Sequence, residues 1–336
     1  MMHRQTADHI ARVMKAVRRC PGTPVARGEL TLDPAFARKY LKWRSRDSRT
    51  ESLSDTALLI ECCKCLELDL ICLQSENVAE SGACSLVALD DIRHIAGAGL
   101  FVFWVVNGAF QTAMTQGDMM AFLMKTAAAP NAIAAALERI SGKVTDVMAK
   151  GVAAGAHGII LADDIAYRQS TYVSPSFVER HLLPLWRRQV AFAKDLGVPV
   201  FFHSDGNLKA ILPFIAAAGF DGLQCVESSA GMDLGDIKKG YGGHLCLMGS
   251  IDPGLLCEAE GVDDSDSRYA CLRRSVADAM AAAGDGGVIL GTCSGLHAGM
   301  SPRLVDTLYR LAAEMDPMCR KRFAAAGPAS RTEIEK

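Results

Sequence analysis

The chain has 336 residues, of which 50% are hydrophobic and 22% are charged, and its formal net charge is −2. This length is long for an ordinary domain but normal for a single α/β barrel, and the apolar content is sufficient for a large core. The small net charge, with Lys and Arg spread along the chain, argues against a basic nucleic-acid-binding face or a polybasic membrane patch. We therefore expect no nucleic-acid or membrane partner.

The apolar runs and the cysteines both favour a cytoplasmic location. The longest apolar runs, such as Phe101–Val106, are too short to span a bilayer, and the N-terminal residues contain no signal-peptide-like segment. Twelve cysteines fit a reducing compartment. Three of them, Cys62, Cys63 and Cys65, resemble a metal cluster but have apolar, helix-like flanks and no second Cys/His pair at zinc spacing. Packing of these thiols on a core is therefore favoured over zinc binding.

In chain order, a helix over Thr6–Arg19 is expected first, covering the lower end of the fold. Eight short apolar runs bounded by turn residues then predict eight strands: Pro24–Leu30, Leu68–Leu73, Phe101–Val106, Gly158–Ala162, Pro199–Phe202, Gly222–Val226, His244–Met248 and Gly287–Gly291. Segments with helical periodicity separate these runs and include Asn131–Gly151, Ser174–Leu196 and Val262–Ala283.

Alternating strands and helices imply parallel strands joined by right-handed crossovers, and eight such units are the number that closes a barrel. An open doubly wound sheet usually has a glycine-rich phosphate turn after its first strand, and Pro24–Leu30 has no such turn. We therefore predict an α/β fold in which residues 1–336 form one (β/α)8 TIM-barrel domain. Its N-terminal helix falls within residues 1–20, and residues 324–336 are expected to form a flexible tail.

Polar residues follow the predicted strands, where the active site of a parallel barrel is located. The fifth strand gives the clearest case, since its apolar run ends in His203, Ser204, Asp205 and Gly206. The other predicted strand ends supply Glu29, Asn107, Asp163, Asp164, Glu227, Asp252 and Cys293. Consecutive strand residues point to opposite sides, so only one of Asp163 and Asp164 can enter the mouth. We predict Asp164, because it comes later and is therefore more exposed at the carboxyl end.

Zinc accepts imidazole nitrogen, thiolate sulfur and carboxylate oxygen, and a catalytic zinc site keeps one position open. His203, Glu227 and Cys293 are therefore predicted as three zinc ligands. Asp205 is either a fourth ligand or an acceptor for the imidazole N–H. In the alternative, the carboxylates bind polar groups of a substrate and Cys293 only packs.

Several motifs together resemble the uroporphyrinogen decarboxylase superfamily from about Arg12 to Leu311. The strongest is His203–Asn207, and others are Gly28–Leu30, Val106–Phe110, Asp163–Ala166, Ala218–Gly222, Met248–Pro253 and Gly286–Gly291. The resemblance implies an (α/β)8 barrel independently of the strand count. It also implies one of two chemistries.

The porphyrinogen decarboxylases of this superfamily use no metal or cofactor and hold substrate carboxylates with an early arginine-rich segment. The matching region here, Arg19–Glu29, lacks that motif and retains only Arg27 as a carboxylate clamp. A substrate with several carboxylates requires several fixed guanidinium groups. Decarboxylation is therefore the second hypothesis.

The other branch contains corrinoid-dependent methyltransferases, several of which bind zinc through a His-x-Cys motif and a later Cys. By this resemblance, His203 and Cys293 remain as ligands, whereas Asp205 stands where the first thiolate is expected. The resemblance thus implies a zinc site with an oxygen ligand in place of a sulfur ligand. A harder zinc site favours an oxygen-linked methyl donor over a thiol acceptor such as coenzyme M.

The leading hypothesis is a zinc-assisted methyltransferase that moves a methyl group between a small methylated compound and a corrinoid carried by a partner protein. Asp164, Asp205 and Tyr172 are the predicted catalytic residues, and substrate binding is assigned to Arg27, Glu29, Asn107 and Asp252. A third hypothesis is a non-catalytic barrel that binds a metal or a tetrapyrrole. The methyl donor, the direction of transfer and the oligomeric state, for which a homodimer is one candidate, stay open.

Overall fold

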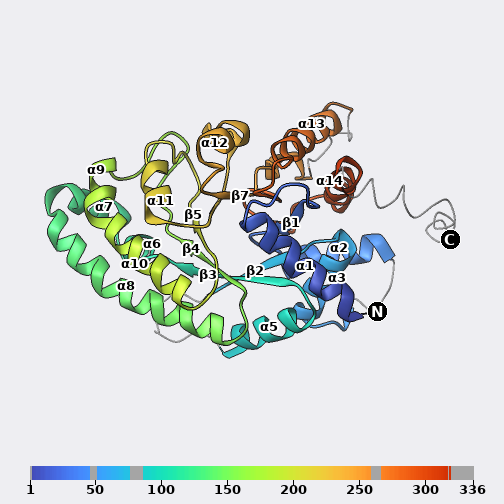
Figure 1. Ribbon diagram of the computed structural model, residues 1–336, viewed down its shortest axis with the longest axis horizontal. Helices are drawn as coiled ribbons and strands as arrows, with labels where there is room; N and C mark the ends of the chain where they lie inside the picture. The colour runs from blue at the N-terminus through green and yellow to red at the C-terminus, as the bar shows by residue number, and fades with distance from the viewer. Residues whose placement is uncertain (1, 46–50, 76–85, 259–265, 317, 319–336) are drawn as a thin grey trace.

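Eight parallel strands follow one another around a closed barrel in the computed structural model, which describes residues 2–45, 51–75, 86–258, 266–316 and 318 (Figure 1). The strands are β1 Ala26–Glu29, β2 Leu70–Gln74, β3 Phe101–Asn107, β4 Gly158–Ala162, β5 Val200–His203, β6 Gly222–Gln224, β7 Cys246–Met248 and β8 Val288–Leu290. Each overlaps one predicted strand. The predicted (β/α)8 fold is confirmed.

The first and last strands close the barrel by pairing with each other. Gly28 of β1 lies opposite Leu70 of β2, and Ala26 lies opposite Ile289 of β8. Closure of this kind leaves no strand edge exposed, so every strand has a neighbour on both sides.

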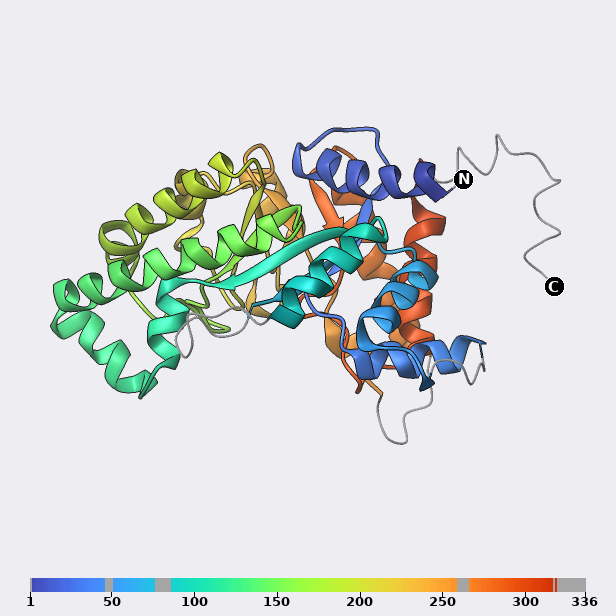
Figure 2. The same ribbon diagram turned by 90° about the horizontal axis from the view of Figure 1, so that it is seen from below.

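Helices surround the strands on the outside. They are α1 Met2–Val17, α2 Pro34–Ser45, α3 Asp55–Leu66, α5 Leu86–Gly97, α6 Ala109–Thr115, α7 Met119–Ala128, α8 Pro130–Ala153, α9 Pro175–Phe177, α10 Leu183–Asp195, α11 Leu212–Ala218, α12 Leu234–Tyr241, α13 Asp266–Ala282 and α14 Pro302–Met315. In both Figure 1 and Figure 2, α7 and the start of α8 lie at the end of the molecule remote from the two termini.

The predicted helix over Ser174–Leu196 is interrupted in the structure. A π-helical turn over Val178–Leu182 separates α9 from α10, and Pro184 lies in the first turn of α10. Proline has no N–H to donate to the preceding turn, so the regular hydrogen-bond ladder cannot pass through this position. The predicted helices over Asn131–Gly151 and Val262–Ala283 correspond to α8 and α13, although residues 262–265 lie outside the described part of the chain.

Two apolar layers form the core, and strand alternation assigns residues to them. Inside the barrel, the Phe103 ring lies 4.8 Å from that of Phe101 and 4.9 Å from that of Phe201, centre to centre. Between barrel and helices lies the larger layer, which contains Trp104 and Phe202. Residues of opposite parity therefore meet opposite layers, as the two-residue period of a strand requires.

Helix α1 covers the lower end of the barrel, as expected from the sequence. Val13, Ala16 and Val17 are buried in the same cluster as the inward-facing residues of the strands, and α1 contacts β1, β2, β3 and β8. The thiols of Cys62 and Cys63 on α3 are fully buried in the outer layer, as the packing interpretation predicted. The predicted tail over 324–336 lies outside the described residues.

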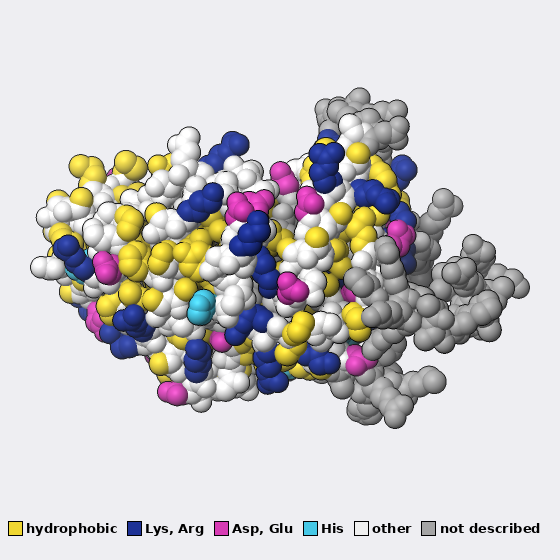
Figure 3. Space-filling model, turned by 45° about the horizontal axis from the view of Figure 1, so that its top comes forward, with side chains coloured by type: hydrophobic (Ala, Val, Ile, Leu, Met, Phe, Trp, Pro, Cys, Tyr) yellow, Lys and Arg dark blue, Asp and Glu magenta, His cyan; other side chains and the backbone are white. Residues whose placement is uncertain are grey.

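The surface gives no strong single-sign patch on the face shown in Figure 3, where basic and acidic side chains are intermixed with apolar ones. Among the described residues, no helix has both the length and the apolar character needed to cross a membrane.

Candidate active site

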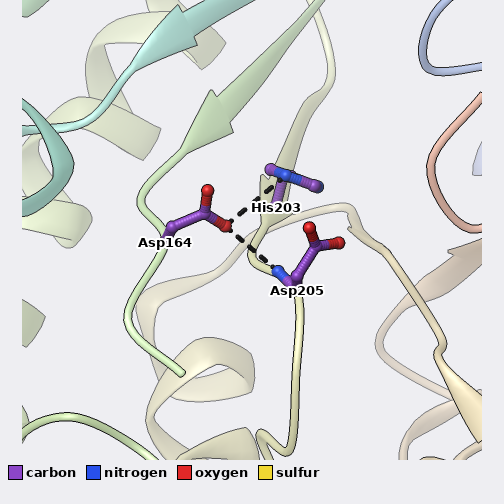
Figure 4. Close-up of side chains that lie close together, drawn as sticks. All are labelled: Asp164, His203 and Asp205. Carbon is purple, nitrogen blue, oxygen red and sulfur yellow. Dashed lines mark hydrogen bonds and ion pairs between the residues drawn. The ribbon is translucent and has the colours of Figure 1, made fainter. Parts of the chain in front are cut away.

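His203, Asp164 and Asp205 meet at the carboxyl ends of β4 and β5 (Figure 4). His203 ends β5 and shares the inward face of Phe201, so its imidazole points into the mouth and is only 7% exposed. The Oδ1 atom of Asp164 lies 3.6 Å from His203 Nε2 and accepts the Asp205 backbone N–H at 3.1 Å. Two successive loops of the barrel are thereby joined through one carboxylate.

The three side chains form a candidate metal site. Each offers one ligand atom, and these atoms all lie within 4.8 Å of one another. One imidazole nitrogen and two carboxylate oxygens are a donor set that zinc accepts, with room for a further ligand in a catalytic site. The donor chemistry of the described residues therefore fits the metal implied by the sequence.

Asp163, next in the chain to Asp164, faces the helices instead of the mouth. Its carboxylate is buried and accepts hydrogen bonds from the Trp186 indole at 2.9 Å and the Gln111 backbone N–H at 2.8 Å. Burial raises the pKa of Asp163 to about 6, although these hydrogen bonds oppose the shift. Any side chain at Gly108 would collide with this carboxylate, since a Cβ there would lie 2.4 Å from Asp163 Cγ.

The loops after β4 and β5 pack tightly against each other. Ser204 Oγ accepts the Ile165 backbone N–H at 3.1 Å, and the Asn207 N–H donates to the Tyr167 carbonyl at 2.9 Å. Gly206 has a φ of +85°, and a Cβ there would lie 2.6 Å from the Tyr167 carbonyl oxygen. Only glycine fits this turn, which fixes the position of the neighbouring Asp205.

Tyr172 belongs to the same loop as Asp164. Its ring stacks on that of Tyr167 with 5.6 Å between ring centres, and its backbone N–H donates to the Ile165 carbonyl. These contacts give the residue a packing function in the loop. Its predicted catalytic function stays a prediction.

A cavity of about 240 Å3 opens beside the candidate metal site. It is lined by Asp205, Glu227, Ser228, Ser229, Asp252, Pro253, Cys293 and Ser294. None of these described lining residues carries a positive charge. The cavity therefore suits a small polar or cationic molecule better than a polyanion.

The predicted ligand set of His203, Glu227 and Cys293 differs from the group that the structure brings together. Glu227 and Cys293 line the cavity, but the candidate metal site found among the described residues contains Asp164 and Asp205 with His203. The Glu227 carboxylate accepts the Gly206 N–H at 3.2 Å and the Ser229 hydroxyl. The Cys293 thiol donates to the Val226 carbonyl at 3.4 Å. Both side chains are thus held by local partners.

The environment of Asp205 shifts the pKa of its carboxyl upward from the ordinary value. Desolvation by the walls of the mouth raises its pKa, the imidazole of His203 opposes that shift, and the carboxylates of Asp164 and Glu227 add to it. The Cys225 thiol also hydrogen-bonds to Asp205 and interacts with Cys293, and its pKa is raised well above the ordinary value, mainly by the Cys293 contact and by burial.

Sequence reasoning missed Gln224, which lies beside His203 on the inward face of β6. The two residues are partners in the strand register, and His203 Nδ1 is hydrogen-bonded to Gln224 Oε1. Gln224 Nε2 in turn donates to the Cys293 carbonyl at 2.7 Å. A polar residue within the otherwise apolar run Gly222–Val226 was the available signal, because buried amides require partners.

Comparison with known proteins identifies the family to which the chain belongs. A family model described as uroporphyrinogen decarboxylase (URO-D) matches residues 96–315, which is more than half of the chain. The protein belongs to the uroporphyrinogen decarboxylase family. The match includes β3 to β8 and the whole of the candidate metal site. Membership of this family supports an enzymatic function for the barrel.

Solved structures resemble this family member in fold. A methyltransferase from Methanosarcina mazei shares 15% sequence identity with a TM-score of 0.70, covering 91% of this chain and 98% of that one. A putative vitamin-B12 independent methionine synthase from Listeria monocytogenes shares 12% identity with a TM-score of 0.50, covering 88% and 98%. At these identities the likeness concerns the fold alone. No curated protein matches the chain.

In this uroporphyrinogen decarboxylase family member, Glu29 does not face the mouth. Its carboxylate is fully buried and accepts the Thr292 hydroxyl at 2.6 Å, the Thr292 N–H and the Tyr309 hydroxyl. Burial raises the pKa of Glu29 to about 7, against the effect of these hydrogen bonds. Its predicted contact with substrate is corrected to a structural position at the junction of β1, β8 and α14.

Arg27 also faces the helices. Its side chain is 3% exposed, pairs with Glu67 at 3.2 Å and lines a separate cavity of about 190 Å3 beside α3 and α14. The reason is strand parity: Ala26 packs in the inner cluster, so Arg27 and Glu29 take the outer face of β1. The predicted carboxylate clamp at the mouth is therefore corrected.

The remaining predicted substrate residues lie at the barrel mouth. Asp252 lines the 240 Å3 cavity, and its carboxylate caps the short 3₁₀ turn Pro253–Leu255 by accepting the Gly254 N–H at 2.8 Å. Asn107 ends β3 opposite Ala162 and is half-buried. Their predicted contacts with substrate stay predictions.

Proposed function

We propose that the protein is a methyltransferase that moves a methyl group between a small methylated compound and a corrinoid carried by a separate protein. The observation that carries this proposal is the imidazole and two carboxylates at the mouth, beside a small cavity without basic residues. The motifs that resemble the corrinoid-dependent methyltransferase branch of the superfamily support this proposal. The fold of the Methanosarcina methyltransferase, which covers nearly the whole chain, is consistent with it.

Asp164, His203 and Asp205 would hold a zinc ion. When bound, zinc supplies a Lewis acid that polarises an oxygen atom of the methyl donor. One nitrogen and two oxygen ligands make a harder site than one rich in thiolates, so we favour an O-methyl ether as donor. Glu227, Cys293 and Asp252 line the adjacent cavity and would contact the rest of the donor.

In the proposed direction, the bond between oxygen and methyl carbon would break, and the corrinoid of the partner protein would supply the nucleophile that accepts the methyl group as a cation equivalent. The oxygen keeps the electron pair and takes up one proton, so the donor leaves as an alcohol or phenol. Asp164 and Asp205 orient the donor oxygen, and Tyr172 shapes the loop that carries Asp164. The corrinoid protein would dock over the barrel mouth.

Metal analysis tests the site. We expect about one zinc per chain, lost on replacing His203 with Ala, because loss of one ligand typically costs tenfold or more in affinity. The matched control is His94→Ala on α5, an exposed histidine far from the mouth in sequence. Elemental analysis showing no transition metal after zinc is supplied would remove the metal from the proposal.

Methyl transfer is tested with free cob(I)alamin and a panel of small O-methyl and N-methyl compounds, followed by the absorbance change on cobalt methylation. We expect transfer from at least one donor, dependent on His203 and unaffected by His94→Ala. Absence of transfer from the whole panel, with folded and zinc-loaded protein and with methylcobalamin also inert as a donor, would contradict the proposal.

The decarboxylase alternative makes the opposite prediction, namely turnover of uroporphyrinogen without metal. We expect no coproporphyrinogen, because three carboxylates and no basic residue line the described cavity and Arg27 faces the helices. Like charges in a confined site repel a polycarboxylate substrate. Coproporphyrinogen formed at an enzymatic rate would reverse the order of the two functions.

A further inference from the structure

Gln224 and His203 form a hydrogen-bonded pair whose orientation is fixed from outside the pair. The Cys293 carbonyl oxygen can only accept a hydrogen bond, and a Gln224 side-chain nitrogen lies 2.7 Å from it. The amide must therefore direct Nε2 toward Cys293 and Oε1 toward the imidazole. A side-chain flip would bring two acceptor oxygens together at Cys293.

The fixed amide determines the protonation pattern of the imidazole. Gln224 Oε1 is also only an acceptor, so the hydrogen bond between them requires a proton on His203 Nδ1. A neutral imidazole carries one N–H, which leaves Nε2 with its lone pair. That atom faces the Asp164 carboxylate at 3.6 Å, in the group with Asp205.

The backbone leaves room for this arrangement. Gln224 reaches past β7 to the segment after β8, and the intervening Gly249 has a φ of +84°. A Cβ at Gly249 would lie 3.0 Å from the Thr292 carbonyl and 3.6 Å from Gln224 Nε2. Gln224 is fully buried, and its side-chain oxygen and nitrogen are hydrogen-bonded to His203 of β5 and to Cys293 after β8. The side chain therefore has little freedom to rotate.

We infer that Gln224 is a positioning residue that holds neutral His203 as its Nδ1–H tautomer and presents the Nε2 lone pair to the carboxylates at the mouth. The inference deepens the proposed function and rests on it for the identity of the metal, but not for the tautomer. A histidine metal ligand is commonly oriented by a hydrogen bond to its other ring nitrogen, which fixes ring and tautomer together.

The tautomer is measured by long-range 1H–15N NMR of the full chain, labelled with 15N-histidine, free of metal and at neutral pH. Eight histidines are present, and a His203→Ala spectrum assigns the resonances of interest. We expect a protonated, pyrrole-type Nδ1 and a pyridine-type Nε2 for His203. A pyrrole-type Nε2 in the unmodified protein would overturn the inference without any variant at Gln224.

Three variants separate positioning from packing. Gln224→Leu should lose the Nδ1–H preference and bind Zn²⁺ about 10–100-fold more weakly. Gln224→Glu with its buried carboxyl protonated keeps an acceptor for His203 and a donor for the Cys293 carbonyl, and should retain the Nδ1–H tautomer. Gln189→Leu removes a second buried glutamine, bonded to Ser141 at 3.2 Å, and should leave tautomer and zinc affinity unchanged. Retention of the Nδ1–H tautomer in Gln224→Leu would contradict the inference.

The two proposals fail in different ways. A fixed Nδ1–H tautomer in a protein that binds no zinc would support the positioning function of Gln224 and reject the proposed zinc site. If Gln224→Leu leaves both zinc binding and methyl transfer unaffected, the methyltransferase proposal is supported and the positioning function of Gln224 is rejected. If Gln224→Leu does not fold, the unmodified protein and Gln224→Glu still decide the tautomer.

Discussion

The ends of β1 and β4 both hold carboxylates, yet of these two strand ends only that of β4 presents a carboxylate to the mouth. Asp164 follows β4, faces inward and keeps 33% of its side chain exposed beside His203. Glu29 ends β1, faces outward and is fully buried against Thr292 and Tyr309. Similar residues in similar positions of the sequence thus have different surroundings.

The difference shows that the surroundings of a carboxylate depend on which face of its strand it occupies, and not only on how near it lies to the strand end. In β4 the inward residues are Ile160 and Ala162, which places Asp164 in the mouth and Asp163 among the helices. In β1 the inward residue Ala26 leaves Glu29 on the outer face. A carboxylate in the mouth can meet substrate, whereas one on the outer face must be satisfied by the protein.

The largest expected effect comes from replacing, one at a time, the two aspartates that follow β4, Asp163 and Asp164. Asp164→Asn should lower methyl transfer by about 100-fold or more and leave the thermal midpoint nearly unchanged. Asp163→Asn should instead destabilise the fold by about 1–3 kcal/mol, because a buried amide nitrogen cannot accept the bonds now made by Trp186 and Gln111. Steady-state kinetics and thermal unfolding of both variants measure the contrast.

The contrast would be lost if Asp164→Asn unfolded readily and kept its specific activity. Asp164 would then be a structural residue like its neighbour, and the assignment of the mouth-facing carboxylate would be wrong.

A second effect concerns pH and the Glu29 region. Because the pKa of Glu29 is raised to about 7 in the folded protein from an ordinary 4.5, the folded state binds the proton more tightly than the unfolded state. Stability contributed by this group is therefore present below about pH 4.5 and is lost as pH rises toward 7. The loss is at most about 3 kcal/mol.

Urea unfolding of the unmodified protein and Glu29→Gln across this pH range measures that slope. The difference in unfolding free energy between the two proteins should change with pH between about 4.5 and 7 and be constant above it. A difference that is independent of pH would show that Glu29 titrates normally in the folded state.

The smallest effect isolates one hydrogen bond of the same region. Tyr309→Phe removes the hydroxyl that donates to Glu29 and should cost about 1–2 kcal/mol of stability, with specific activity per folded molecule unchanged. Tyr167→Phe, at a tyrosine that is 42% exposed beside the mouth, is the matched control and should change stability little. A loss of activity without a loss of stability in Tyr309→Phe would mean that this region acts on the mouth.

Much of the fold was predictable because it depends on local patterns. All eight apolar runs became strands, since a strand of a parallel barrel is buried on both faces and appears as a continuous apolar segment. Alternation also predicted that only one of Asp163 and Asp164 enters the mouth, and Asp164 was chosen because it comes later and is more exposed at the strand end. The π-helical turn before Pro184 was not predicted, because the helical period continues through it.

The site was predictable only in part. The sequence places His203, Asp164 and Asp205 at the ends of neighbouring strands, but a continuous apolar run does not reveal which residues face inward. For β1 the inward positions are the small residues Ala26 and Gly28, so no apolar alternation marked Arg27 and Glu29 as outward-facing. Gln224 was missed because its partners come from β5 and from the segment after β8.

The hydrogen bonds around Glu29 also bear on the order in which parts of the barrel can form. They join residues 263 and 280 positions apart, and the Val25 N–H bonds to an Asp316 oxygen across 291 positions. The contacts that unite β4, β5 and β6 at the mouth span only 21 to 41 positions. The segment from β4 to β6, which carries the candidate metal site, therefore precedes β8, the last neighbour of β1, in the chain. Closure of the barrel requires contacts between β1 and residues more than 260 positions later in the chain.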